Sequence, residues 1–321
     1  MRRLVLIAGI IGVVAVALLV WPRASPPLRP HPDPAAHYAE ALVRFDMLRA
    51  EEGQEVSAEC GTRLLTHGHR TGRAIVLLHG LTNCPAQFDS LARVFFASGM
   101  NVLVPRLPQH GLADRMTEAL ARSDAAEMCA FTDRVVDIAC GLGDGVTIAG
   151  LSTGGVLAAW AGQERREVDR AVLIAPLLGI GYARGPLMPP AVRLMHVLPN
   201  AFVWWDAKAK EQLGGPKHVY PRFATRAIAA SLDVGMVTLS RAGRSAPACR
   251  ERVMVTVGGD KAVDNARCAE LVDLWRREGR HVTAYEFPAD LRLNHDVVDP
   301  EQVGGNPTVT YPVLIRLIVG T

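Results

Sequence analysis

The sequence lacks several patterns that mark other classes of protein. Its charges nearly balance, with 35 Lys and Arg against 32 Asp and Glu, and no basic run alternates with aromatic residues as a nucleic-acid groove requires. It has no internal repeat and no Cys-x-x-Cys pair. His67 and His69 stand close together, but they lack nearby acidic or thiol residues that would complete a metal site. We therefore expect no nucleic-acid partner and no bound metal.

Cysteine is scarce but even in number. An even set is compatible with disulfides in an oxidising compartment, and buried free thiols are the alternative. The sequence alone selects no pairing among the six, which are Cys60, Cys84, Cys129, Cys140, Cys249 and Cys268.

The N-terminus carries a long uncharged apolar run. Residues 4–20 contain no charge, follow Arg2 and Arg3, and precede Trp21. As a helix this run would span about 26 Å, close to the roughly 30 Å of a bilayer's hydrocarbon core. Residues 20–25 make a poor signal-peptidase site, so we expect residues 1–21 to be an uncleaved transmembrane anchor. A cleaved signal peptide, with secretion of the protein, is the alternative.

A proline-rich stretch follows the apolar run. Residues 22–36 contain six prolines and should form an extended linker between the membrane and a domain at 37–321. Basic residues flank the apolar run on both sides, so the positive-inside rule gives only a slight bias. We expect the domain to lie on the non-cytoplasmic side, periplasmic or extracellular.

Strand-like and helix-like segments alternate through most of the remaining chain. Strands are expected at 74–78, 101–104, 145–149, 171–175, 252–257 and 282–287, and helices at 86–98, 123–140, after residue 152 and at 307–319. This alternation predicts an α/β fold with a mostly parallel sheet and helices on both faces. The active site is then expected beyond the carboxyl ends of the strands.

The alternation fails between Pro176 and Pro247, where short amphipathic pieces, prolines and aromatic residues occur. We expect a helical lid insertion at about 177–248. Its aromatic side chains should pack the lid onto the core, and lining of an acyl pocket is the alternative. These aromatics are Phe202, Trp204, Trp205, Tyr220 and Phe223.

The most informative motif is GLSTG at residues 150–154, which places Ser152 between two glycines directly after a predicted strand. A strand, a sharp turn and a helix in this order can present a serine as a nucleophile. Gly150 and Gly154 matter because such a turn is strained and leaves its neighbours no room for side chains.

Two other candidate residues follow later strands. Asp260 comes after the strand expected at 252–257, and His295 comes after the one expected at 282–287. Histidine can accept and return a proton near neutral pH, and an aspartate can fix its tautomer. Asp264 is the alternative acid, although it could instead cap the next helix. Asp296 is expected to point away from the site.

Five segments together resemble the α/β-hydrolase superfamily, and most closely its carboxylesterase and monoacylglycerol-lipase-like branch. They are residues 77–82, 104–111, 150–155, 258–260 and 294–296. The resemblance runs from about residue 62 to the C-terminus. It implies the order nucleophile, acid, base for Ser152, Asp260 and His295. It also implies an oxyanion hole made by the backbone N–H groups of Leu81 and Thr153.

Within this resemblance, the other histidines take supporting places. His79 and Gly80 belong to the loop that carries the oxyanion donor, and His79 is expected to order that loop. His110 lies in a turn that the family often carries near the site without a catalytic role.

The sequence therefore predicts a serine hydrolase that cleaves small-molecule carboxylic esters through an acyl-enzyme, without a cofactor. A lid with aromatic residues and a membrane tether favour lipid-like or apolar esters. A peptidase, amidase or thioesterase using the same residues is the alternative. A second alternative is a non-catalytic binding protein with the same fold.

Overall fold

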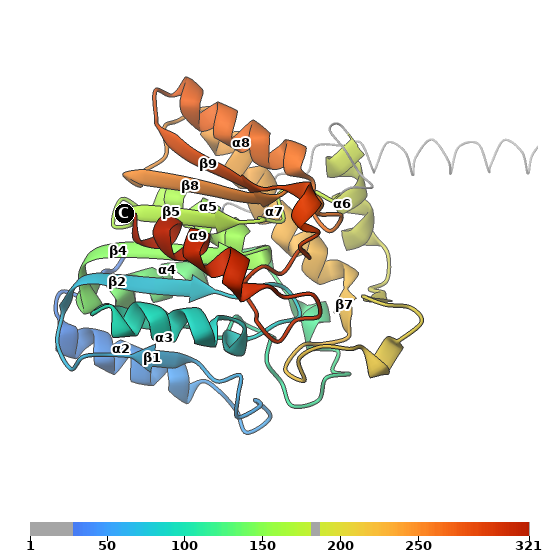
Figure 1. Cartoon of the computed structure of the whole chain (residues 1–321), viewed down its shortest axis with the longest axis horizontal. Coiled ribbons are helices and arrows are strands. Elements are labelled where there is room, and N and C mark those ends of the chain that lie inside the picture. The colour runs from blue at the N-terminus through green and yellow to red at the C-terminus, as the bar shows by residue number, and fades with distance from the viewer. Residues whose placement is uncertain (1–27, 181–186, 321) are drawn as a thin grey trace, which may run out of the picture.

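The computed structural model describes residues 28–180 and 187–320 (Figure 1). The expected anchor at 1–21 and the first part of the linker lie outside these residues. Within the described ranges, no helix combines the length and the apolar character needed to cross a bilayer.

A central sheet of seven strands organises the molecule. Only β1, at one edge, runs antiparallel to its neighbour, and the other neighbouring strands pair in parallel. The strand order is β1 (Arg63–Leu65), β3 (Asn101–Val104), β2 (Thr71–Leu78), β4 (Gly143–Leu151), β5 (Arg170–Ile174), β8 (Glu251–Val257) and β9 (Val282–Phe287).

The middle of the sheet is buried on both faces, which explains its continuous apolar runs. Residues 74–78 of β2 are at most 1% exposed, as a strand covered by helices on both sides requires. In the register of β2 and β4, Leu78 pairs with Gly150. The loop after β2 and the turn after β4 therefore leave the sheet side by side at its carboxyl edge.

Helices cover both faces of the sheet (Figure 1). α3 (Asp89–Ala97) and α9 (Pro307–Val319) pack on one face, and α4 (Ala125–Leu142), α5 (Thr153–Glu164) and α8 (Asn265–Arg277) pack on the other. α2 (Tyr38–Ala50) lies against α4, and α7 (Thr225–Ala242) lies against α5. The predicted α/β architecture is thus confirmed.

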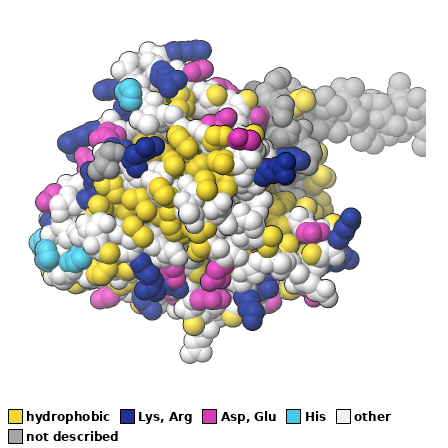
Figure 2. All heavy atoms as spheres, viewed as in Figure 1, with side chains coloured by type: hydrophobic (Ala, Val, Ile, Leu, Met, Phe, Trp, Pro, Cys, Tyr) yellow, Lys and Arg dark blue, Asp and Glu magenta, His cyan; other side chains and the backbone are white. Residues whose placement is uncertain are grey.

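The surface of the molecule is partly apolar over α9. Figure 2 shows hydrophobic side chains gathered over the part of this face where α9 lies in Figure 1. Three of the side chains of α9, Val309, Val313 and Ile315, are only half-buried. The inner face of α9 packs on β4 and β5, while these three side chains remain partly open to solvent.

The segment expected as a lid divides into two parts. α6 (Met188–Val197) and a two-stranded antiparallel ribbon, β6 (Phe202–Trp204) with β7 (Arg222–Ala224), lie at the carboxyl edge of the sheet (Figure 1). The following α7 instead belongs to the helical layer, because side chains such as Ala227, Ala230 and Val234 are buried. Residues 181–186 of this segment lie outside the described ranges.

Short 3-10 turns complete the described chain. They are η1 (Pro85–Phe88), η2 (Ala119–Arg122), η4 (Lys210–Gln212) and η5 (Ala289–Leu291).

Candidate active site

Ser152 sits at a strained turn between β4 and α5. Its φ of 56° and ψ of −113° lie in a region that residues other than glycine rarely adopt. A Cβ atom on Gly154 would lie 2.0 Å from the carbonyl oxygen of Leu78, and one on Gly150 would lie 2.2 Å from the carbonyl oxygen of Gly154. The close approach of these backbones explains both glycines, and it lets the turn present Ser152 at the carboxyl edge of the sheet.

Asp260 and His295 meet at the same edge. Asp260 follows β8 and His295 follows β9, and Nδ1 of His295 lies 2.6 Å from Oδ2 of Asp260. The Asp260 side chain is fully buried, whereas the His295 side chain is 23% exposed. The other oxygen of Asp260 accepts a hydrogen bond from the N–H of Ala262 at 2.7 Å, which fixes the orientation of the carboxylate.

The other two reactive atoms of the site are Oγ of Ser152 and Nε2 of His295. Among the described residues, neither Oγ of Ser152 nor Nε2 of His295 has a hydrogen-bond partner, so no bond joins the two side chains in this arrangement. Such bonds are often long in free enzymes and tighten only when substrate binds.

The loop after β2 lies against the serine turn. A Cβ atom on Gly80 would stand 3.6 Å from Cβ of Ser152. The N–H of Gly80 donates to Oε1 of Gln87 at 2.8 Å, so this amide is already occupied. By contrast, the amides of Leu81 and Thr153 find no acceptor in the part of the chain that the structure describes. These are two donors that could stabilise a developing negative charge.

His79 holds the loop from within. Its Nε2 accepts a hydrogen bond from the N–H of Leu107 at 3.0 Å, and its Nδ1 donates to the carbonyl oxygen of Gly80 at 2.9 Å. Complete burial lowers the pKa of His79 well below its usual value, and the nearby imidazole of His110 acts in the same direction. A neutral imidazole of this tautomer satisfies both bonds, so His79 orders the loop and is not placed to exchange protons with substrate.

His110 lies edge-on to His79, with ring centroids 5.1 Å apart. Its Nδ1 donates to the carbonyl oxygen of Pro108 at 2.7 Å, while its Nε2 is buried without a partner among the described residues. Burial lowers the pKa of His110 to about 4. The ring is therefore neutral at physiological pH.

The lid segment docks on the loop after β2 through Thr82. The carbonyl oxygen of Thr82 accepts from the N–H of Tyr220 at 2.8 Å, and its hydroxyl accepts from Nε1 of Trp205 at 2.9 Å. Thr82 itself has a φ of 66°, which is uncommon for a β-branched residue. Contacts from two parts of the lid thus hold a strained residue next to Leu81.

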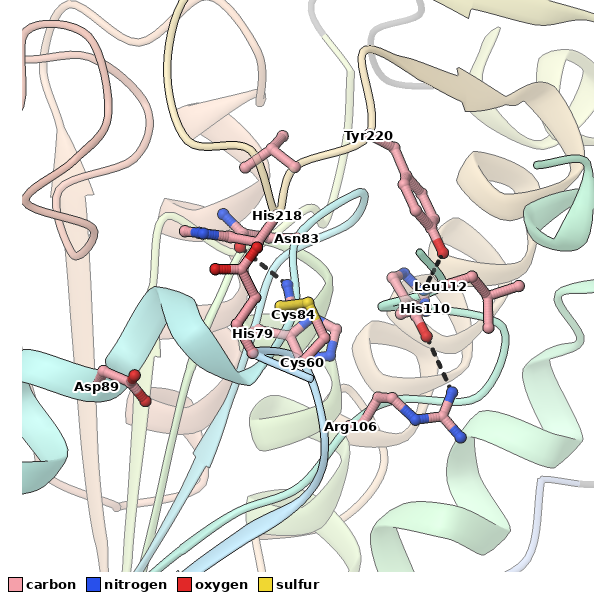
Figure 3. Close-up of a disulfide and its surroundings, with 12 residues drawn as sticks. Cys60, His79, Asn83, Cys84, Asp89, Arg106, His110, Leu112, His218 and Tyr220 are labelled. Carbon is pink, nitrogen blue, oxygen red and sulfur yellow. Dashed lines mark hydrogen bonds between the residues drawn. A yellow bond between two sulfur atoms is a disulfide. The ribbon is translucent and has the colours of Figure 1, made fainter. Parts of the chain in front are cut away.

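A disulfide fastens the far end of the same loop (Figure 3). Cys84 bonds to Cys60, and the surrounding residues include His79, Arg106 and His110. The four other cysteines are free, and burial raises the pKa of each of them, for example to about 11 for Cys249. Since thiolates rather than thiols are reactive, these four are unsuited to nucleophilic chemistry.

The two aspartates near His295 have separate places. Asp264 accepts a hydrogen bond from the N–H of Ala266 at 3.1 Å and caps α8. Asp296 is buried, and its Oδ1 accepts from the N–H groups of Val298 and Asp299, both at 3.0 Å. Of the three candidate acids, only Asp260 bonds to His295.

Two buried groups at this edge have no evident signal in the sequence. Gln87 lies in η1, and its Nε2 donates to Oδ2 of Asp296 at 2.6 Å. His218, in the lid segment, has its Nε2 3.0 Å from Oδ2 of Asp299. Neither Gln87 nor His218 belongs to a recognisable sequence motif. Each is positioned by contacts between segments that come together only in the folded chain. No group of His, Cys, Asp and Glu suited to a metal ion occurs among the described residues.

The chain belongs to the alpha/beta hydrolase family. The model of this family matches residues 75–302, which hold the serine turn, Asp260 and His295. A search of curated proteins found no match.

Solved structures share the fold at low sequence identity. A metagenome-derived lipolytic enzyme is 20% identical, with a TM-score of 0.58, and the match covers 82% of this chain and 98% of that one. The monoacylglycerol lipase of Paleococcus ferrophilus is 13% identical, with a TM-score of 0.58 and coverage of 81% and 98%. The monoglyceride lipase of Saccharomyces cerevisiae is 12% identical, with a TM-score of 0.59 and coverage of 81% and 90%.

Proposed function

We propose that this hydrolase cleaves carboxylic esters with Ser152 as nucleophile, His295 as general base and Asp260 as the acid that orients it. The observation that carries the proposal is the 2.6 Å contact between Nδ1 of His295 and Oδ2 of Asp260. When Nδ1–H donates to this buried carboxylate, Nε2 is left unprotonated and can accept a proton from Ser152. The carboxylate also stabilises the imidazolium that then forms.

The reaction would proceed in two steps. Oγ of Ser152 attacks the ester carbonyl carbon while Nε2 of His295 takes the hydroxyl proton, and that proton then passes to the departing alcohol. Water then attacks the acyl carbon while Nε2 of His295 takes a proton from it, and that proton returns to Oγ of Ser152 as the bond to the acyl group breaks and the acid leaves. The amides of Leu81 and Thr153 would bind the oxyanion, and losing one such donor typically costs about 100- to 1000-fold in rate.

The exposed side chains of the lid segment favour an apolar substrate. Trp205 is 43% exposed although it is bonded to the loop that carries Leu81, and its ring lies tilted against that of Phe223, with centroids 4.6 Å apart. Other exposed apolar side chains of this segment are Leu187, Leu194, Val197, Leu198 and Val203. An aromatic and aliphatic surface beside the site suits acyl chains better than charged groups.

Labelling with a fluorophosphonate probe tests the nucleophile. Wild-type protein should take up the label, Ser152→Ala should not, and Ser98→Ala, which removes an exposed hydroxyl in another part of the fold, should label like wild type. Equal labelling of wild type and Ser152→Ala would exclude Ser152. A folded wild type that takes up no label would favour a non-catalytic binding protein, with which the unbonded Ser152 hydroxyl is also compatible.

The substrate class needs a second measurement. We expect p-nitrophenyl esters to be cleaved, with kcat/KM rising with acyl length beyond acetate. Matched p-nitroanilides and thioesters should react more slowly. Faster turnover of either would instead make the protein an amidase, a peptidase or a thioesterase.

We also propose that residues 1–21 anchor the protein in a membrane, with the catalytic domain on the non-cytoplasmic side. The uncharged run at 4–20 and the Cys60–Cys84 disulfide, which needs an oxidising compartment, support this location. The full chain should stay with membranes during alkaline carbonate extraction, and a chain lacking residues 1–21 should not. Recovery of a soluble chain that has lost this N-terminal segment would favour cleavage and secretion.

A further inference from the structure

Gln87 lies buried between the two loops that carry the proposed machinery. It is 1% exposed, and both ends of its amide are used. Oε1 accepts the N–H of Gly80 at 2.8 Å, and Nε2 donates to Oδ2 of Asp296 at 2.6 Å. One side chain thus joins the loop after β2 to the loop that contains His295.

The Asp296 end of this bridge is firmly held. With Gln87 on one oxygen and two backbone N–H groups on the other, the Asp296 carboxylate accepts three hydrogen bonds. Asp299, which supplies one of these N–H groups, bonds through its own carboxylate to His218 of the lid segment. The loop after His295 is therefore fixed relative to both Gln87 and the lid.

The Gly80 end of the bridge selects which amide faces the substrate. Because the N–H of Gly80 is bonded to Gln87, it cannot serve the oxyanion, and the next amide, that of Leu81, is the one left free. Asp296 follows His295 directly in the sequence, so a shift of Asp296 would move the base. The side-chain amide of Gln87 therefore helps to position both the oxyanion donor, the N–H of Leu81, and the base, His295.

We propose that Gln87 is a positioning residue that sets the oxyanion loop and the His295 loop at a fixed separation. The inference rests on the proposed function and adds to it a residue that does not touch the substrate. The bridge requires a side chain that accepts from Gly80 and donates to Asp296. Glutamine meets this need at every pH, whereas a glutamate in its place meets it only when protonated.

The test compares Gln87→Met with Gln87→Glu. Methionine at this position can neither accept the hydrogen bond from Gly80 nor donate one to Asp296. Misplacing catalytic groups by about 1 Å can cost about 100-fold in rate, so Gln87→Met should lower kcat about 10- to 100-fold while KM stays within about threefold. For Gln87→Glu, kcat divided by the wild-type value should rise as the pH falls from about 8.5 to about 5.5. A proton shared between the introduced carboxyl group and that of Asp296 would then restore the bridge.

The charged surroundings are compatible with this protonation. Burial raises the pKa of Asp296, and the other titratable groups nearby are Asp299, its partner His218, Tyr311 and His295. Dividing each rate by the wild-type rate at the same pH removes the pH effects that the variant shares with the wild type. For Gln87→Met the corresponding ratio should not vary with pH.

Gln163→Met provides the matched control. Gln163 is also a buried bridging amide, bonded to Trp275 and Ser245, but it lies on α5 and its side chain forms no hydrogen bond with either loop among the described residues. It should lower the melting temperature and leave kcat within about twofold of wild type.

A ratio for Gln87→Glu that does not change with pH would overturn the inference, even if Gln87→Met failed to fold. So would a kcat within about twofold of wild type for both Gln87 variants. Failure of the proposed function is separate, because it would appear in the wild type as absent fluorophosphonate labelling.

Discussion

Asp260 and His295 lie 35 positions apart in the sequence, yet Oδ2 of the first stands 2.6 Å from Nδ1 of the second. They approach because β8 and β9 are parallel neighbours, so the loops at their carboxyl ends emerge together. The contact favours Asp260, the acid that the sequence predicts, over the alternative Asp264, which lies only four positions further on and caps α8 instead.

Asp260→Asn should therefore lower kcat by about 1000-fold or more, because an amide at this position no longer holds the required tautomer of His295. KM should change by no more than a few fold. Asp264→Asn is the matched control, since asparagine also caps helices well, and it should retain nearly full activity. Loss of activity in Asp264→Asn alone would reverse the assignment of the acid.

Gly154→Ala should cost about 3 kcal/mol or more of unfolding free energy and remove activity, because the new methyl group would lie 2.0 Å from the carbonyl oxygen of Leu78. Gly72→Ala, which changes a glycine in β2, should be tolerated, because no neighbouring atom lies within 4 Å of the new methyl group. Chemical denaturation of both variants measures the difference. Similar stabilities for the two would show that the serine turn is looser than the structure indicates.

The Cys60–Cys84 bond should stabilise the folded chain by about 3 kcal/mol, because it closes a segment with a sequence separation of 24. Reductant should lower the melting temperature of wild type and of Cys140→Ser, which leaves the bond intact. The double variant Cys60→Ala/Cys84→Ala should have a lower melting temperature than wild type, and reductant should not change it. A wild-type melting temperature that reductant does not change, despite complete reduction, would contradict this expectation.

Acid should destabilise the protein through the buried imidazoles. The folded pKa of His110 is about 4, below its ordinary value near 6.5, so the unfolded chain binds more protons between these pH values. The contribution is complete above about pH 6.5 and is lost as the pH falls toward 4. It amounts to roughly 3 kcal/mol, of which about 2 kcal/mol is lost by pH 5. His79, whose pKa is also lowered, adds to the effect.

Urea unfolding at pH 7 and pH 5 measures this loss. His110→Gln should lose less stability than wild type between the two pH values, because glutamine does not titrate. His281→Gln, which removes an exposed imidazole, is the matched control. If wild type and His110→Gln lose stability in parallel, the imidazole at position 110 is not the group that titrates.

Sequence and structure agree closely on the bounds of several elements. The strands expected at 101–104 and 282–287 and the helix at 307–319 coincide with β3, β9 and α9. The sequence pattern did not predict β1, which has only three half-buried residues, or α2, which buries only Ala41 and Leu48. Such elements depend on neighbours for stability, and a pattern of buried residues is too short to reveal them.

The parallel α/β sheet and the serine turn could be predicted from the residues alone. A strand that is buried on both faces needs a continuous apolar run, and a turn with no room for side chains needs glycines, so both features are visible in short stretches of sequence. The folded chain was needed to show which aspartate bonds to His295, which cysteines pair, and that Gln87 joins the two loops. These relationships connect segments far apart in the chain. The register of the strands and the packing of the loops create them, and no short stretch of residues specifies that geometry.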